Sequence, residues 1–213
     1  MFTGIVEEVG TVVGTDVGAQ SALLTVRATT VLEGTEVGDS MLTDGVCLTV
    51  ASLAGDRFTA DVVPETFRRT TLAGKLAGAP VNLERALTLR SRLGGHLVTG
   101  HIDAVGVVRR VERRANALAV SLTAPREVTA LSVGQGSIAV DGVSLTIVSV
   151  AGGELEVALI PHTAAVTTLG GLRPGSRVNL EVDVIAKYVA AFLGRAQAGE
   201  GLTWERLAEA GFV

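Results

Sequence analysis

The sequence predicts an all-β fold: two tandem, similar, six-stranded Greek-key barrels followed by a C-terminal helix. The first observation behind this prediction is an internal repeat, because DGVCLTV at 44–50 returns as DGVSLTI at 141–147, 97 residues later. Further blocks recur at the same offset, namely 64–66 with 161–163, 70–72 with 167–169, and 81–84 with 178–181. The block 3–5 returns at 99–101, one residue out of step. One module is therefore present twice, and two copies of one pocket are expected.

The second observation is a succession of short β-branched segments separated by Gly and Asp, which is typical of a sandwich or barrel. Closing each copy into a barrel removes open strand edges. Each Asp-Gly pair fits a tight type I′ hairpin turn or a simple sharp bend. The segments that follow Pro64 and Pro161 fit a short helical turn and loop. Strands are expected over 4–13, 22–28, 46–53, 58–63 and 81–89, and over 105–111, 118–123, 137–140, 143–150, 154–160 and 177–182.

Three parts follow from this pattern: a first barrel over 1–90, a second over 97–183, and a helical segment over 184–213. Gly94-Gly95 is the expected hinge between the barrels. In the last part, apolar residues from Val184 to Leu193 form one stripe at helical spacing. Asp183 is the expected N-cap and Gly194 the expected end, with a second short helix over 203–212. The stripe fits packing on its own barrel and oligomerisation equally well.

Composition excludes several classes of protein. The net charge of −4 and the aromatic content of 3% do not suit a nucleic-acid-binding surface. The mean hydropathy is high, at +0.45, yet there is no continuous apolar run of the roughly 18 residues that a membrane span needs. The N-terminus does not read as a secretory signal. A single cysteine fits a reducing compartment, so a cytoplasmic location is expected.

The two copies differ where chemistry could occur. Cys47 in the first copy is replaced by Ser144 in the second, and Ile5 is replaced by His101. Thiol, hydroxyl and imidazole groups serve as nucleophiles or in proton transfer. Considered singly, Cys47 is more typical of a small buried residue and a lone histidine is more often structural. A metal site at His96 and His101 is not expected, since no further ligand completes a set. No phosphate-binding loop or dinucleotide fingerprint is present.

The motifs together resemble the riboflavin synthase family over essentially the whole chain. They are MFTGIVE at 1–7, DGVCLTV at 44–50, GGHLVTGHI at 94–102, DGVSLT at 141–146 and IPHT at 160–163. The resemblance implies a homotrimer assembled through the C-terminal helix, with the active site between the first barrel of one subunit and the second of its neighbour. It implies that two 6,7-dimethyl-8-ribityllumazine molecules give riboflavin and 5-amino-6-(ribitylamino)uracil by four-carbon transfer, with no metal or organic cofactor.

The resemblance also implies the site. Cys47, His101 and Ser144 are the expected catalytic residues, with His101 and Ser144 together in one pocket and Cys47 near the partner ring. Ser40 and Asp183 match further positions of the family's site. Gln135 and His162 depart from the basic residue and the glutamate found in some members.

Each barrel is expected to bind one lumazine with its own segments. The first pocket would use Gly4, Ile5, Val6, Cys47, Leu48, Thr49, Asp61, Val62, Val63, Pro64, Glu65 and Thr66. The second would use Gly100, His101, Ile102, Gln135, Ser144, Leu145, Thr146, Ile160, Pro161, His162, Thr163, Ala164 and Ala165.

Two other functions are compatible with the same fold. One is a non-catalytic antenna protein that holds lumazine or flavin, which could dispense with one pocket. The other is a flavin-binding barrel of an oxidoreductase, which would need a nucleotide-binding domain. The chain has Cys47, His101 and Ser144 in two intact copies, which favours the enzyme.

Overall fold

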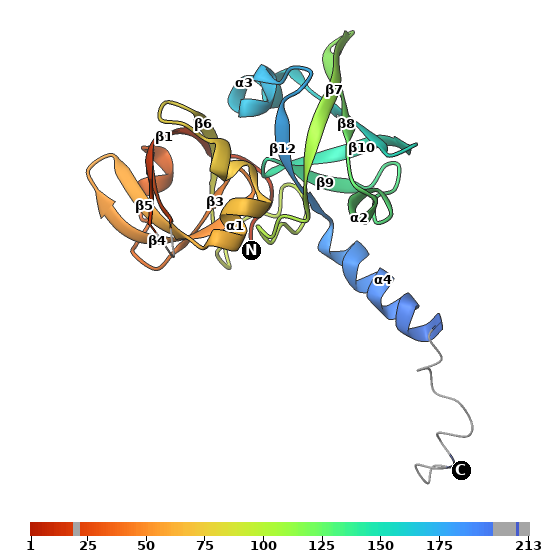
Figure 1. The fold of residues 1–213 in the computed structure, drawn as a ribbon, viewed down its shortest axis with the longest axis horizontal. Coiled ribbons are helices and arrows are strands. Elements are labelled where there is room, and N and C mark those ends of the chain that lie inside the picture. The colour runs from red at the N-terminus through yellow and green to blue at the C-terminus, as the bar shows by residue number, and fades with distance from the viewer. Residues whose placement is uncertain (19–21, 198–207, 209–213) are drawn as a thin grey trace.

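The computed structural model describes residues 1–18, 22–197 and 208. It contains two closed six-stranded antiparallel barrels side by side, as the sequence predicts (Figure 1). Around each barrel the first strand neighbours the second and the sixth, and the second neighbours the fifth. This order is a Greek key, which closes the sheet and leaves no open edge.

The first barrel follows the predicted segments with three exceptions. Its first strand spans residues 8–17 and not 4–13, the strand predicted over 81–89 ends at Arg85, and the strand at Ser40 is not among those predicted. Its elements are β1 (Glu8–Val17), β2 (Ala22–Arg27), the 3-10 turn η1 (Thr30–Leu32), β3 (Ser40–Thr43), β4 (Val46–Ala54), β5 (Arg57–Val62), α1 (Pro64–Arg69), η2 (Thr71–Gly74) and β6 (Pro80–Arg85).

The second barrel repeats this plan. Its elements are β7 (Ala104–Arg114), β8 (Ala117–Thr123), α2 (Arg126–Thr129), β9 (Ser137–Val140), β10 (Val143–Ala151), β11 (Glu154–Leu159), α3 (Pro161–Val166), η3 (Thr168–Gly171) and β12 (Arg177–Val182). The helical turns after Pro64 and Pro161 are α1 and α3, which confirms that prediction. Each barrel has its own core of buried aliphatic side chains.

The Asp-Gly pairs form tight turns and not simple bends. Asp44 and Gly45 both have positive φ, at 45° and 82°, and link Thr43 to Val46 across the β3–β4 hairpin. Asp141 and Gly142 do the same, at 44° and 78°, between β9 and β10. Positive φ at both central residues is the type I′ geometry that matches the twist of the paired strands.

Asparagine side chains join the two barrels at these turns. Asn82 on β6 donates from Nδ2 to the carbonyl of Asp141 at 2.9 Å, and its Oδ1 accepts from the amide of Thr168 at 2.8 Å. Asn179 on β12 makes the mirror-image pair with the carbonyl of Asp44 and the amide of Thr71, both at 2.8 Å. Both asparagines are buried, so these four hydrogen bonds fix the barrels to each other.

Helix α4 (Val184–Gln197) projects away from both barrels (Figure 1). Asp183 Oδ1 accepts from the amide of Ile185 at 2.9 Å, which confirms the predicted N-cap. The predicted end at Gly194 is wrong: the helix continues to Gln197, because one glycine inside a helix costs only about 1 kcal/mol. The second helix expected over 203–212 falls outside the described residues except for Ala208.

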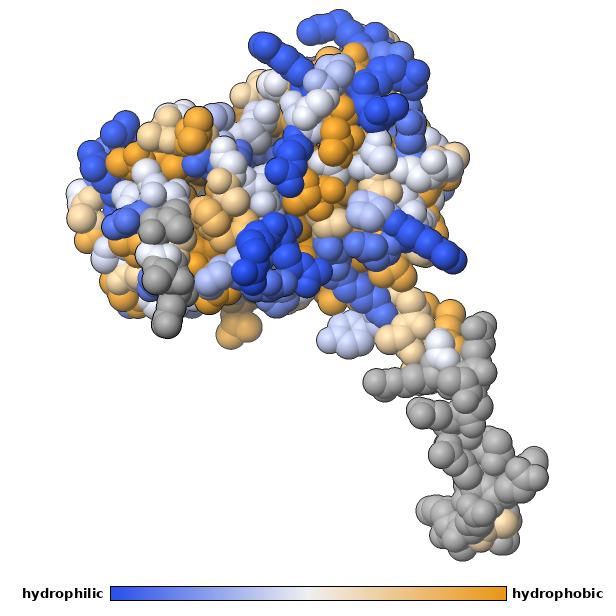
Figure 2. Space-filling view, in the orientation of Figure 1, coloured by the Kyte–Doolittle hydropathy of each residue, from blue (hydrophilic) through white to orange (hydrophobic). Residues whose placement is uncertain are grey.

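The apolar stripe of α4 does not pack on its own barrel. Tyr188 and Phe192 are each 75% exposed, and Ile185 is 58% exposed. The space-filling view shows apolar residues on this projecting segment, while hydrophilic residues gather at the opposite end, over β7 and β8 (Figure 2). Of the two interpretations left open by the sequence, packing on its own barrel is therefore wrong.

Candidate functional site

A leading segment precedes the first strand of each barrel, residues 1–7 before β1 and residues 96–103 before β7, and each leading segment reaches across to the other barrel. Phe2 and Val98 pair through two backbone hydrogen bonds, which brings the two leading segments side by side. Beyond this pair, the carbonyl of Gly4 accepts from the amide of Ser144 at 2.8 Å. In the mirrored position, the carbonyl of Gly100 accepts from the amide of Cys47 at 2.9 Å.

Only glycine fits at these two crossings. Gly4 and Gly100 have positive φ, at 75° and 83°. A Cβ on Gly4 would lie 2.6 Å from the Cβ of Ser144, and one on Gly100 would lie 2.4 Å from the Cβ of Cys47. The turns after Thr3 and Thr99 therefore combine a backbone conformation that favours glycine with a contact that excludes any side chain.

This crossing corrects the predicted grouping of the two pockets. Gly4 lies against Ser144 and Val6 packs on the core of the second barrel, whereas Gly100 lies against Cys47 and Ile102 packs on the core of the first barrel. Within one chain, His101 and Ser144 therefore lie on opposite sides of the crossing. The reason is the Phe2–Val98 pairing, which carries each leading segment past the junction before its own first strand begins.

The first pocket is a cavity of about 500 Å³ at the crossing on the Cys47 side. Six of the predicted site residues line it, from three separate segments: Cys47, Glu65, Thr66, Gly100, His101 and Ile102. Cys47 is half-buried and His101 is exposed, so both are accessible from the cavity. Its rim is charged, with Arg69, Asp103 and Glu127. Hydrogen bonding from Arg68 lowers the pKa of the Glu65 carboxyl at the same rim.

On the Ser144 side, a histidine that the sequence analysis did not select completes the arrangement. Nδ1 of His96 lies 2.7 Å from the hydroxyl oxygen of Ser144, and the backbone amide of His96 donates to the carbonyl of Thr3 at 3.1 Å. His96 is buried, and burial lowers its pKa, with the charge of Asp183 acting in the opposite direction. The imidazole is therefore neutral at pH 7, and its tautomer with the proton on Nε2 leaves Nδ1 as the acceptor of the serine hydroxyl proton.

Gly95 accounts for the close approach of His96 to Ser144. A Cβ on Gly95 would lie 2.2 Å from the carbonyl oxygen of Thr3 and 2.8 Å from the hydroxyl oxygen of Ser144. The pattern GGH at 94–96 is the sequence signal for this pair, and its glycines do more than form the hinge that the sequence predicts. Glycine also permits another segment to approach the backbone closely, as Thr3 and Ser144 do at Gly95.

Other predicted residues lie at two further cavities. One, of about 670 Å³, is lined by Ile5, Ser40, Glu84, Arg85 and Arg92 among others. The other, of about 320 Å³, lies between α3 and the β7–β8 hairpin and includes Pro161, Ala164 and Ala165. These residues are thus separated from the Cys47 pocket within one chain.

Several residues that the sequence predicts to contact the ligand can do so only through their backbone groups, because their side chains are buried. Leu48, Val62 and Leu145 point into the barrel cores and are at most 8% exposed. Their neighbours Thr49, Asp61 and Thr146 alternate to the outside of the strands. Gln135 has a φ of 65°, at the position that Gly38 occupies in the first copy. Within the described part of the chain, no three His, Cys, Asp or Glu side chains form a candidate metal site.

The repeated fold agrees with a known domain family. A model of the lumazine binding domain matches residues 3–86 and again residues 99–183, one match for each barrel. The chain belongs to the lumazine-binding domain family. The two matches correspond to the two copies found in the sequence, and each begins at the leading segment that crosses to the opposite barrel.

Relatives within this lumazine-binding family are similar over nearly their whole length. Riboflavin synthase of Mycobacterium tuberculosis (strain ATCC 25618 / H37Rv) is 48% identical over 201 residues, covering 92% of this chain and all of the relative. Riboflavin synthase of Actinobacillus pleuropneumoniae is 40% identical over 215 residues, covering all of both chains.

Solved structures of LumP share the fold. The complexes with 6,7-dimethyl-8-(1'-D-ribityl) lumazine and with riboflavin superpose with TM-scores of 0.77 and 0.79, at 27% and 28% identity. Both cover 85% of this chain and 99% of LumP. In the described residues of the present chain, no helix has the length and apolarity required to cross a membrane.

Proposed function

We propose that the chain catalyses the riboflavin synthase reaction, a dismutation of two 6,7-dimethyl-8-ribityllumazine molecules. One molecule transfers a four-carbon unit to the other, and the products are riboflavin and 5-amino-6-(ribitylamino)uracil. The observation that carries this proposal is the 40–48% identity to riboflavin synthases over almost the whole chain. Two similar pockets with different reactive side chains suit a reaction in which identical molecules take unequal roles.

The residues divide between the pockets according to the crossing of the leading segments. Cys47 and His101 serve the lumazine bound on the first barrel, and the Ser144–His96 pair serves the lumazine bound on the second. The reaction requires removal of a proton from the C7 methyl group of one lumazine. Neutral His96 accepts a proton through the hydroxyl of Ser144, which makes this pair the base that we favour.

Positioning contributes as much as proton transfer. Backbone groups of the strands around Thr49 and Thr146 are available to the edge of the pteridine ring, and their exposed hydroxyls suit the ribityl chain. Holding two rings in reacting geometry can lower the barrier by several kcal/mol, about 7–11 kcal/mol in the best cases. All of the chemistry is assigned to the substrates and these side chains, without a metal or an organic cofactor.

Assembly brings two half-sites together in this proposal. The chain forms a homotrimer through α4, and the first barrel of one subunit faces the second barrel of its neighbour. Support comes from the exposed stripe of α4, where Tyr188, Val189 and Phe192 are each at least 52% exposed. The separation of Ser40 and Ile5 from the Cys47 cavity is also consistent with a site shared between subunits. The single cysteine favours a cytoplasmic location.

The decisive experiment mixes the purified protein with 6,7-dimethyl-8-ribityllumazine alone and follows the products by absorbance and chromatography. We expect riboflavin and the pyrimidine co-product in equal amounts, without added metal or cofactor. Ser144→Ala should lower kcat about 100-fold or more if the Ser144–His96 pair is the base. Binding of lumazine with altered fluorescence but no turnover would contradict the proposal and identify an antenna protein.

A further inference from the structure

Two buried glutamates occupy the same position in the two copies and have no assigned role. Glu84 ends the VNLE block of β6 and is 4% exposed, and Glu181 ends the VNLE block of β12 and is 1% exposed. A buried carboxylate is costly unless hydrogen bonds compensate for the lost hydration. Each of these carboxylates accepts three hydrogen bonds from the leading segment of its own barrel.

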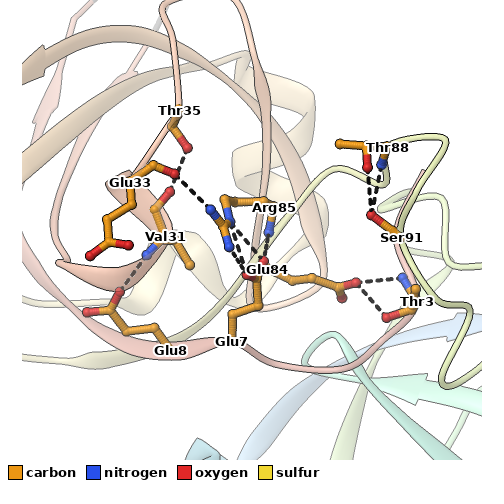
Figure 3. Close-up of polar contacts among 10 residues, drawn as sticks. All are labelled: Thr3, Glu7, Glu8, Val31, Glu33, Thr35, Glu84, Arg85, Thr88 and Ser91. Carbon is orange, nitrogen blue, oxygen red and sulfur yellow. Dashed lines mark hydrogen bonds and ion pairs between the residues drawn. The ribbon is translucent and has the colours of Figure 1, made fainter.

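Glu84 holds the first leading segment. Its Oε1 accepts from the amide and the hydroxyl of Thr3 at 2.6 and 2.8 Å, and its Oε2 accepts from the amide of Gly4 at 2.9 Å. Figure 3 shows the Glu84 side chain directed at Thr3, away from the Glu7–Arg85 ion pair beside it. Thr3 and Gly4 lie outside the strands of the sheet, so Glu84 supplies the bonds that a strand partner would supply.

The held segment leads directly to the Ser144–His96 pair. The carbonyl of Thr3 accepts from the amide of His96 at 3.1 Å, and the carbonyl of Gly4 accepts from the amide of Ser144 at 2.8 Å. Both members of the pair are therefore attached to residues that Glu84 holds. The distance between Nδ1 of His96 and the hydroxyl of Ser144, 2.7 Å, depends on this attachment.

Glu181 holds the second leading segment in the same manner. Its Oε1 accepts from the amide and the hydroxyl of Thr99 at 2.7 and 2.6 Å, and its Oε2 accepts from the amide of Gly100 at 2.9 Å. Gly100 then accepts from the amide of Cys47 and precedes His101 in the cavity of about 500 Å³. Glu181 therefore fixes His101 relative to Cys47.

We propose that Glu84 and Glu181 are positioning residues, each of which organises the pocket of the opposite barrel. Glu84, in the first barrel, aligns Ser144 and His96 of the second pocket, while Glu181, in the second barrel, aligns His101 with Cys47 of the first. The catalytic consequence rests on the proposed function, but the cross-barrel control of each segment does not.

Glutamine tests the carboxylate specifically. Glu84→Gln keeps the size of the side chain but turns one acceptor oxygen into an NH2 group, which faces an N–H donor of Thr3 or Gly4. Glu181→Gln does the same for Thr99 and Gly100. A matched control is Glu8→Gln, because Glu8 also accepts from two backbone amides, those of Thr29 and Val31, but within one barrel. Figure 3 shows the contact with Val31.

The first measurement is amide hydrogen exchange on the full chain without ligand. We expect Glu84→Gln to speed exchange at the amide of Ser144 by about tenfold and to leave Cys47 unchanged, and Glu181→Gln to do the reverse. Glu8→Gln should affect neither amide. Equal effects of both variants on both amides, or an effect confined to the mutated barrel, would overturn the proposal. If a glutamine variant does not fold, Thr3→Val and Thr99→Val each remove one donor and give the same crossed comparison.

The second measurement is a pair of double-mutant cycles on kcat. We expect each glutamine variant to lower kcat about tenfold. Glu84→Gln should add little to Ser144→Ala but multiply with Cys47→Ser, and Glu181→Gln should show the opposite pattern. Multiplicative effects in all four combinations would contradict a positioning role. If the unmodified protein makes no riboflavin, the proposed function fails, and the exchange measurement alone decides the cross-barrel proposal.

Discussion

At the scale of single residues, the burial of His96 determines how the Ser144–His96 pair responds to pH. Burial lowers the pKa of His96 below its usual 6.5. Its folded-state pKa is depressed, so its contribution to stability is present above pH 6.5 and is lost as pH falls from 6.5 through the folded pKa. In the proposed function His96 is the neutral base, and this neutral form is lost over the lower part of that range.

We therefore expect the acid limb of the kcat profile to lie below pH 6.5, with rate lost as pH falls through the lowered pKa of His96. His96→Gln should lower kcat about 100-fold and remove this limb. His101→Gln is the comparison, and it should keep the limb whatever its effect on the rate. A limb that persists in His96→Gln would show that another group is the base.

A second prediction concerns the two buried aspartates of the tight turns. Burial and the nearby charge of Asp44 raise the pKa of Asp141 well above its usual 3.8. Burial also raises the pKa of Asp44, but Lys75 forms an ion pair with it and opposes the shift. The first copy has Lys75 where the second has Leu172. Among the residues that the structure describes, Asp141 therefore has no ion pair of its own to offset the cost of burying its negative charge, whereas Asp44 has one with Lys75.

The stability that Asp141 contributes is present below pH 3.8 and is lost as pH rises through its raised folded pKa. Asp141→Asn keeps an acceptor for the amide of Asn179 and removes the charge. We expect it to raise the free energy of unfolding by about 1–3 kcal/mol at about pH 8 relative to the unmodified chain. Asp44→Asn, which leaves Lys75 unpaired, should lower it. Denaturant unfolding across the neutral range measures both, and a loss of stability in Asp141→Asn on the alkaline side would contradict this account.

At the scale of elements, the crossing segments depend on glycine. Gly100 has a φ of 83° and would place a Cβ against Cys47, whereas Gly55, with a φ of 61°, has open space around it. Gly100→Ala should therefore lower the free energy of unfolding by roughly 3 kcal/mol or more, because strain and overlap add. Gly55→Ala should cost only about 1 kcal/mol, from strain alone. Urea unfolding compares the two, and equal losses would show that Cys47 moves aside without cost.

The sequence predicts most elements because their signals are local. Alternating burial in β4 and β5, and the prolines that begin α1 and α3, are visible within a few residues. Strand β3 (Ser40–Thr43) is missing from the predicted strands because it has only 4 residues and no run of β-branched side chains, although its repeat partner at 137–140 is predicted. The sequence places the start of the first strand too early because Ile5 and Val6 are β-branched, although neither residue belongs to the sheet.

At the scale of the whole molecule, the repeat predicts two barrels but not which segment serves which pocket. A leading segment can make the same backbone bonds to Cys47 or to Ser144, because the repeat makes the two sites equivalent. The ambiguity resembles domain swapping, where an identical element occupies either of two copies. The contacts at this junction are made by Asn82 and Glu84 and by their counterparts Asn179 and Glu181. All four lie in the VNLE blocks, where a polar residue at a buried strand position is the sequence signal for such a contact.

At the same scale, we expect the exposed stripe of α4 to govern assembly of the chain. Phe192 is 75% exposed in the single chain, and burying such a side chain contributes roughly 1.5–3 kcal/mol. In the proposed trimer, Phe192→Asp should shift the protein to monomers and abolish turnover, because each active site needs two subunits. Ala190→Asp, on the opposite face of the helix, should leave the trimer intact. Sedimentation velocity with activity measured on the same samples tests this, and a fully active Phe192→Asp monomer would show that one chain completes the site alone.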